Sequence, residues 1–248
     1  RATIAKEKGL EPLAALIMLQ STREPLEELA KAYISEEKEV TSAQDALDGA
    51  KDIIAESISD EAKYRIWIRQ ITMKKGKIVS SAKDEKAESV YEMYHEFEEP
   101  VNRLAGHRVL ALNRGEKEKF LSVKIEAPQE DILRYLEKQI IRKENSYTTP
   151  VLKETIEDSY KRLIAPAIER EIRNELTEKA SEQALKVFSI NLEKLLMQAP
   201  LKDKMVLGVD PAYRTGCKLA VIDETGKLLK ISVIYPHQPN ARTKRSEE

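Results

Sequence analysis

The segment between Pro166 and Pro200 constrains the fold most, because it predicts one very long helix. Its apolar residues first step by four and then continue as a stripe, at Ile168, Ile172, Leu176, Ala180, Ala184, Leu185, Phe188, Leu192, Leu195 and Leu196. This spacing is typical of one face of an α-helix, here about 50 Å long. The polar face carries Glu169, Glu171, Glu175, Glu178 and Glu182, which are unsuited to gripping phosphate. We therefore expect a scaffold helix that connects two domains.

The residues before this helix predict a multi-helix domain over 1–165. Short amphipathic segments follow one another, and most begin at a proline or a capping residue: Pro12, Pro25, Thr41 with Gln44, Ser59 and Pro128. Further helices are expected over Asp84–Glu96 and over Val101–Arg114, the second closed by Gly115. A short strand is expected over Phe120–Ile125, as one of few extended interruptions.

After the long helix the pattern changes to short strands. Three apolar, β-branched runs are separated by turns that contain proline or glycine: Met205–Val209, Leu219–Ile222 and Ile231–Tyr235. This pattern is typical of β-hairpins. We expect a mainly α chain with a helical domain over 1–165, a central connecting helix over 166–200 and the first β-hairpins of an α/β domain over 201–248. Uncovered sheet edges would allow a dimer or a swapped arrangement through residues 205–236.

Charge and composition exclude some classes of function. The 42 lysines and arginines cancel the 43 acidic residues, so any binding to nucleic acid must use local basic patches. The longest wholly apolar run, Leu13–Leu19, is well short of the roughly 20 residues that span a bilayer, so no membrane association is expected. The single cysteine, Cys217, is most simply explained by a reducing cytoplasm. Arg1 in place of an initiator methionine predicts a piece of a longer protein.

Five segments, in the same order, resemble the bacterial Tex family of transcription accessory proteins. They are RATIAKEKGLEPLA at 1–14, ALDGAKDIIAESISDEA at 46–62, HRVLALNRGEKEKFL at 107–121, IEREIRNELTEKASEQALKVFSINLEKLL at 168–196 and VLGVDPAYRTGCKLAVIDETGKLL at 206–229. The resemblance covers nearly the whole chain. An ordered series of segments is far more specific than any one motif.

The resemblance implies part of a helical N-terminal domain, a long central helix and the start of a YqgF-type domain of the RNase H-like class. It also implies binding to RNA or DNA and a role in transcription. In the complete family, helix-hairpin-helix elements and an S1-type domain follow, and these are usually credited with nucleic-acid binding. This chain departs from the family at Ala212, where glycine is common, and it stops at Glu248.

Asp210 is the candidate for catalysis that the strand pattern singles out. RNase H-like nucleases place a first-strand aspartate on one of two divalent cations, but two-metal hydrolysis needs several carboxylates. Asp223 and Glu224 lie in a turn of sequence DETG, where turn chemistry explains them first. Asp210 followed by Pro211 is also an ordinary start of a turn. We interpret Asp210 as a vestigial site, and expect no enzymatic activity, no metal and no cofactor.

Three groups of basic residues are candidates for nucleic-acid binding, each with a structural alternative. The first group would share one helix face within about 40°, with Glu116 and Glu118 as nearby ion-pair partners. The second lies at a helix C-terminus, where the helix dipole already favours cations. The third is an arginine in an exposed turn. The candidates are Arg103, His107 and Arg114, then Lys74, Lys75 and Lys77, and finally Arg214.

The leading hypothesis is a fragment of a nucleic-acid-binding transcription accessory factor that acts as scaffold and interaction surface. One alternative is part of a metal-dependent nuclease of the YqgF or RNase H-like type, inactive when truncated. A second alternative is a helical protein-interaction module for the transcription machinery or the ribosome.

Overall fold

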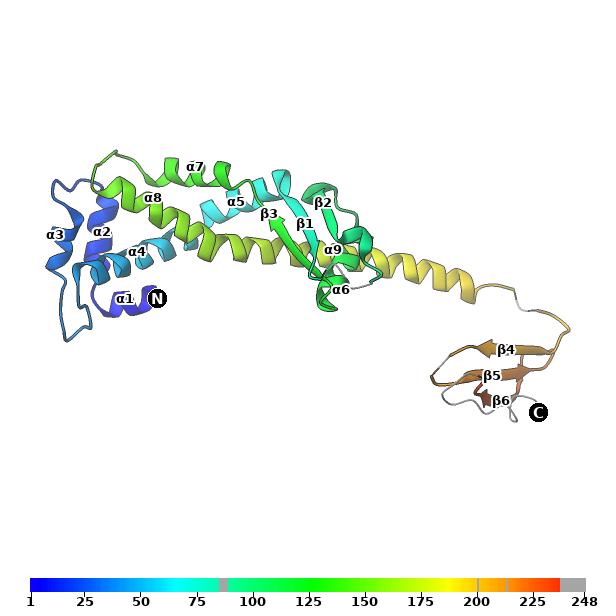
Figure 1. Cartoon of the computed structure of the whole chain (residues 1–248). Helices are drawn as coiled ribbons and strands as arrows, with labels where there is room; N and C mark the ends of the chain where they lie inside the picture. Colours follow the sequence, from blue (N-terminus) through cyan, green and yellow to red (C-terminus); the bar gives the residue numbers. More distant parts are fainter. Residues whose placement is uncertain (85–88, 200, 213, 237–248) are drawn as a thin grey trace. The chain divides into compact units, whose positions relative to one another are not determined.

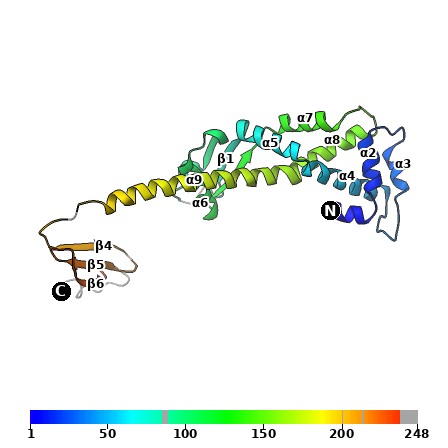
Figure 2. The same ribbon diagram turned by 180° about the vertical axis from the view of Figure 1, so that it is seen from behind.

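The computed structural model describes residues 1–84, 89–199, 201–212 and 214–236, shown from two sides in Figures 1 and 2. The chain forms two compact units, Arg1–Val187 and Phe188–Glu248. The boundary between them falls inside the long helix α9 (Ala165–Leu196). The mainly α fold class is confirmed. The division into domains at residues 165 and 200 stays a prediction.

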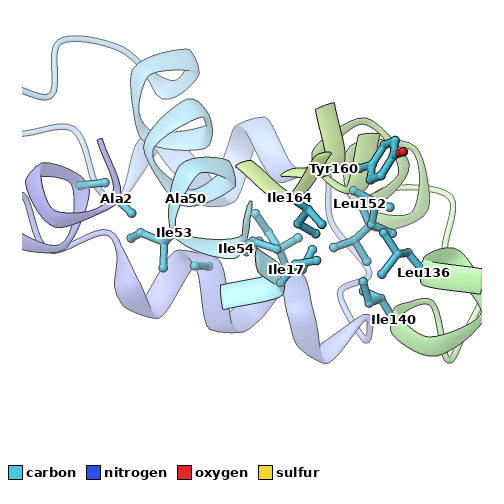
Figure 3. Packing of buried hydrophobic residues seen from close by; sticks show 14 of the residues in the cluster. Ala2, Ile17, Ala50, Ile53, Ile54, Leu136, Ile140, Leu152, Tyr160 and Ile164 are labelled. Carbon is cyan, nitrogen blue, oxygen red and sulfur yellow. The ribbon is translucent and has the colours of Figure 1, made fainter. Parts of the chain in front are cut away.

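The N-terminal half of the first unit is built around one helix, α4. The elements are α1 (Ala2–Glu7), α2 (Glu11–Leu19), α3 (Leu26–Lys31) and α4 (Ala43–Asp60). Each of the first three packs on α4, where Ala46, Ala50 and Ile54 are buried. Figure 3 shows Ile17 of α2 and Ile54 of α4 meeting in this core.

Small residues on α4 allow this close packing. A Cβ atom added at Gly49 would lie 2.3 Å from Cδ1 of Leu10, which is buried. The start of α4 is set by Ser42, whose side chain accepts a hydrogen bond from the backbone N–H of Asp45 at 3.1 Å. The cap therefore lies one residue later than predicted, at Ser42 with Asp45 in place of Thr41 with Gln44.

The long helix α9 does not begin at a loop. It continues from α8 (Thr148–Asp158) through η3 (Ser159–Ile164), a π-helical turn. Pro166 has no N–H to give to the residue four positions earlier, and the wider turn before it accommodates that loss. Ser159 anchors the junction, because its buried hydroxyl donates to the carbonyl of Ala55 in α4 at 2.6 Å.

Only the first part of α9 is buried as its stripe predicts. Ile168, Ile172 and Ala180 lie in the core, whereas Leu185 is 67% exposed and Phe188 is 63% exposed. Two glutamates of the first part form ion pairs within the fold. Glu171 pairs with Arg65 and Glu175 with Arg69, and both arginines come from α5 (Ala62–Lys75). The predicted helix is thus confirmed, and half of its apolar face is solvent-accessible.

A three-stranded sheet in the first unit corrects the predicted helix over Asp84–Glu96. The sheet order is β2-β1-β3, all antiparallel, with β1 (Lys77–Ala82), β2 (Glu96–Pro100) and β3 (Leu121–Glu126). The strand predicted at Phe120–Ile125 is confirmed, but the other two were not expected. Of the predicted helix, residues 85–88 lie outside the described residues. The rest forms the short η1 turn (Glu92–Tyr94) and the start of β2.

The predicted helix over Val101–Arg114 is also corrected at both ends. A single 3-10 turn, η2 (Val101–Arg103), is followed by extended backbone, and α6 spans Gly106–Lys117. Gly115 does not end this helix. A Cβ there would lie 2.6 Å from Cδ1 of Leu121, so the glycine permits β3 to approach α6. The remaining helix, α7 (Gln129–Ile140), begins after Pro128 as predicted.

The second unit contains a separate antiparallel sheet of order β4-β5-β6. Its strands are β4 (Val206–Asp210), β5 (Cys217–Ile222) and β6 (Leu228–Ile234), which confirms the predicted hairpins. Asp210 is the last residue of β4 and pairs in register with Lys218. None of the described helices is both long and apolar enough to cross a membrane.

We predict that Gly49→Ala destabilises the chain by about 1 kcal/mol, although alanine favours a helix over glycine by about 1 kcal/mol. The reason is overpacking against Leu10, which typically costs about 1–3 kcal/mol. Urea denaturation followed by circular dichroism measures the change. In a Leu10→Ala background the clash disappears and the same change should stabilise. An equal effect in both backgrounds would contradict the close contact between these helices.

Candidate nucleic-acid interface

The structure brings Lys74 and Arg103 together, although they are far apart in sequence. Lys77 of β1 is paired with Pro100 of β2, so the residues that follow β2 meet the end of α5. There the N–H of Val101 donates to the carbonyl of Gly76 at 3.0 Å, and the side chain of Asn102 donates to the carbonyl of Lys74 at 3.3 Å. We name Lys74 and Arg103 the α5–η2 basic pair.

The charges of the α5–η2 basic pair are available to a ligand. Both side chains are exposed, and within the described part of the chain neither forms an ion pair. Both are held on backbone that is fixed by hydrogen bonds between α5 and η2. Such cations are suited to phosphate oxygens, which position a nucleic acid without reading its sequence.

Lys75 and Lys77 differ from this pair because each has an acidic partner. Lys75 Nζ lies 2.7 Å from Asp131 Oδ2 of α7, and Lys77 pairs with Glu98 of β2. The hydrogen bond from Lys75 lowers the pKa of Asp131, and that from Lys77 to Glu98 raises the pKa of Lys77. Exposed ion pairs of this kind are weak, so an incoming phosphate can compete for the lysines.

The predicted shared face of Arg103, His107 and Arg114 is wrong, because extended backbone at Leu104 and Ala105 separates Arg103 from α6. His107 is exposed in the first turn of α6. Arg114 Nε donates to Glu118 Oε1 at 2.9 Å. Glu118 also accepts from the Tyr91 hydroxyl, and the bonds from Arg114 and Tyr91 lower the pKa of this carboxyl. Of α6, His107 is the more available candidate.

Glu116 stabilises the fold and does not pair with the predicted basic face. It pairs with Arg173 of α9. Beside it, the side chain of Asn113 donates to Thr177 Oγ1 at 2.8 Å, so α6 is docked on the first part of α9 by polar contacts. Burial raises the pKa of Glu116, but the hydrogen bond and charge of Arg173 outweigh it and leave the pKa below its ordinary value.

Two basic residues on α7 were missed by the sequence analysis. Arg134 and Lys138 are exposed, form no ion pair within the described residues, and together with Lys75 line a hollow of about 300 Å³ between α5 and α7. Their spacing of four residues on a helix was the available signal. The structure adds what the spacing could not show, namely that Lys75 faces them across the hollow.

Arg214 and Asp210 belong to the second unit. Arg214 is exposed in the turn between β4 and β5, and Asp210 is exposed at the end of β4. Asp223 is used by its own turn. Its Oδ1 accepts from the Thr225 hydroxyl at 2.7 Å, from the Lys227 N–H at 3.0 Å and from the Thr225 N–H at 2.9 Å, and these hydrogen bonds, that of the hydroxyl foremost, lower its pKa. Among the described residues, no three ligand-type side chains gather as a metal site would require.

Comparison with known families decides the class of protein. A profile described as Tex central region-like matches residues 20–188, and one described as Tex protein YqgF-like domain matches residues 204–248. The chain belongs to the Tex family. The family resemblance of the sequence is thereby confirmed, as is the assignment of the β4–β6 segment to a YqgF-like domain.

Three relatives illustrate the range of Tex proteins. The chain is 60% identical to the uncharacterized protein YdcI of Bacillus subtilis, with 100% of this chain and 35% of the relative covered. It is 34% identical to the transcriptional accessory protein Tex of Neisseria gonorrhoeae (97% and 32% covered). It is 30% identical to the human S1 RNA-binding domain-containing protein 1 (96% and 25% covered). The chain thus spans about a third or less of these relatives.

The lowered pKa of Glu116 predicts a pH-dependent contribution to stability. A carboxyl whose pKa falls on folding stabilises above its unfolded pKa, about 4.3, and loses this contribution as the pH falls through the folded value. We expect Glu116→Gln to reduce the free energy of unfolding by less than about 1 kcal/mol at pH 7, with the difference vanishing at acid pH. Urea titrations across pH measure this difference in the free energy of unfolding.

The matched control is Glu178→Gln. Glu178 is an exposed glutamate of α9 without an ion pair among the described residues, and the same loss in this control would contradict the role of Arg173.

Proposed function

We propose that this Tex chain is part of a cytoplasmic transcription accessory factor that binds RNA or DNA, and that it acts as scaffold and interaction surface. The names of two relatives, a transcriptional accessory protein and an S1 RNA-binding domain-containing protein, support this proposal. The observation that carries it for this chain is the α5–η2 basic pair, whose two cations are exposed and stand on segments of backbone that are joined by hydrogen bonds.

The distribution of charge supports a localised phosphate contact. The chain as a whole is almost neutral, so there is no long-range attraction to a polyanion. Several cations are already occupied inside the fold, as in the pairs of Arg65 with Glu171 and of Arg173 with Glu116. The cations that remain exposed on α5, η2 and α7 are therefore the ones that a phosphate backbone would meet.

We expect charge reversal at the α5–η2 basic pair, Lys74→Glu with Arg103→Glu, to weaken binding to single-stranded RNA and DNA in gel-shift assays. For two lost phosphate contacts, the slope of log affinity against log salt should fall by about 1.4. The matched control reverses Arg23 and Lys38, which are exposed on the loops on either side of α3 and change the net charge equally. Equal effects of both pairs would argue against a defined contact. Failure of both the chain and full-length YdcI to bind RNA or DNA at low salt would contradict the proposed function.

A protein-interaction role is a second candidate, and the second part of α9 favours it. Phe188, Leu192 and Leu195 are exposed and lie on one helix face. An apolar helix face of this kind suits a groove on a protein such as a component of the transcription machinery or the ribosome. The exposed strands β4 and β6 would also allow association of copies, which stays a prediction. Retention of a partner after nuclease treatment, and its loss in Phe188→Glu with Leu192→Glu, would favour this role.

We expect no nuclease activity, because two-metal hydrolysis needs several carboxylates and Asp210 belongs to no group of three or more ligand-type side chains among the described residues. The chain and full-length YdcI should release no more product from labelled RNA or DNA than buffer with Mg²⁺ or Mn²⁺ alone. Cleavage by the chain that disappears in Asp210→Asn would overturn this expectation. Metal-dependent cleavage by YdcI alone would instead favour the alternative of a nuclease that is inactive in a shorter chain.

A further inference from the structure

The hollow between α5 and α7 has an aromatic wall. The indole ring of Trp67 and the phenol ring of Tyr135 are stacked, with ring centres 3.8 Å apart and planes 9° apart. Tyr64 meets Tyr135 edge-on, with ring centres 6.3 Å apart. All three rings are half-buried. The arrangement joins two helices that are separated by more than fifty residues of chain.

The hollow also has a cationic rim. Trp67, Ile71 and Lys75 follow one another at every fourth position of α5, and Arg134, Tyr135 and Lys138 face them from α7. One carboxylate, that of Asp131, lines the hollow, and it is paired with Lys75. The charge of Arg134 also acts on Asp131, but neither Arg134 nor Lys138 forms an ion pair among the described residues, and both lie beside an aromatic surface.

Packing explains why aromatic residues occur at the inner side of the hollow, because Trp67 and Tyr135 also contact the main core. Packing does not explain the residues at the outer side of the hollow. There two exposed cations flank aromatic rings, and Asp131 is the one acidic residue among the described residues that lines the space. Aromatic rings beside unpaired cations match the two parts of a nucleotide, since a base stacks on a ring while its phosphate meets a cation.

We propose that this hollow binds a base of single-stranded nucleic acid against Trp67 and Tyr135, with Arg134 and Lys138 on the neighbouring phosphates. A volume of about 300 Å³ lies at the lower limit of ordinary ligand pockets, which suits one base. A base inside a duplex has both faces covered by its neighbours, so the site favours a single strand. This inference rests on the proposed function and names a contact for it that is separate from the α5–η2 basic pair.

The chain offers a direct optical test, because Trp67 is its single tryptophan. The probe is an oligothymidylate of about ten nucleotides, which is within the range that single-strand binding surfaces cover. Titration into the 248-residue chain should quench the emission of Trp67 and saturate together with the fluorescence anisotropy of a labelled strand. A duplex of the same length should leave the emission unchanged.

Two variants separate stacking from phosphate contact. Trp67→Leu should weaken binding of the labelled strand at least about 5-fold, the lower range for the loss of one stacked base. Arg134→Glu with Lys138→Glu, both on exposed positions that leave the core intact, should lower the salt slope by about 1.4 and abolish the quenching. Circular dichroism verifies that each variant is folded. Reversal of Arg23 and Lys38 is the matched control for net charge.

Each outcome decides the inference. Quenching by the single strand, lost in the Arg134 and Lys138 variant and kept in the control, supports it. Binding of the strand by anisotropy with unchanged Trp67 emission overturns it while the proposed function stands. Equal quenching by a polyglutamate peptide also overturns it, because the hollow would then be a general anion site. If neither the chain nor full-length YdcI binds any strand, the inference and the proposed function both fail.

Discussion

The first unit depends on the close approach of other elements to α4. This helix contacts α1, α2 and α8 and carries the short side chains of Ala46, Ala50 and Ala55 in the core, and a Cβ at Gly49 would lie 2.3 Å from Leu10 Cδ1. Larger residues would push the neighbours outward and open the core between them. With the backbones close together, the apolar residues of helices distant in sequence form one continuous cluster, which reaches from Ala2 to Ile172. Close packing of this kind is what makes the unit rigid enough to hold surface groups in fixed positions.

The long helix α9 adds a second set of fixed contacts that are polar. Glu171 and Glu175 of this helix pair with arginines of α5, and its Arg173 pairs with Glu116 of α6. These three carboxylates, which would repel a phosphate, are in this way paired with basic side chains of the protein. The basic residues that stay exposed and form no ion pair among the described residues lie on α5 and on its neighbours η2 and α7. The same distribution of charge therefore stabilises the fold through ion pairs and leaves other cations exposed for a ligand.

The sequence predicted what local signals determine. A proline or capping residue followed by an apolar stripe located α4, α7 and α9, and the apolar, β-branched runs between turns located the strands of the YqgF-like sheet. It did not predict β1 or β2, because Lys77–Ala82 is short and mostly small or polar, and its pairing partners lie far away in sequence. Gly115 was misread because a glycine near a helix end is typical of a cap, whereas here its role is to permit the close approach of Leu121. Likewise, the sequence was enough to name each candidate cation. That the segments carrying Lys74 and Arg103 meet follows only from the register of β1 with β2, which the sequence did not reveal.

The π-helical turn between α8 and α9 has a consequence for how this family can change. A π turn contains one residue more than the α-helical turn that would replace it, so one residue can be removed here while the helix on either side keeps its rotation. After deletion of one residue between Ser159 and Ile164, an α-helical turn can form, and Ile168, Glu171 and Glu175 stay on their faces of α9. The same deletion further along α9 would rotate the side chains that follow it by about 100°. The π turn is therefore the place where this long helix can change its length without losing its contacts.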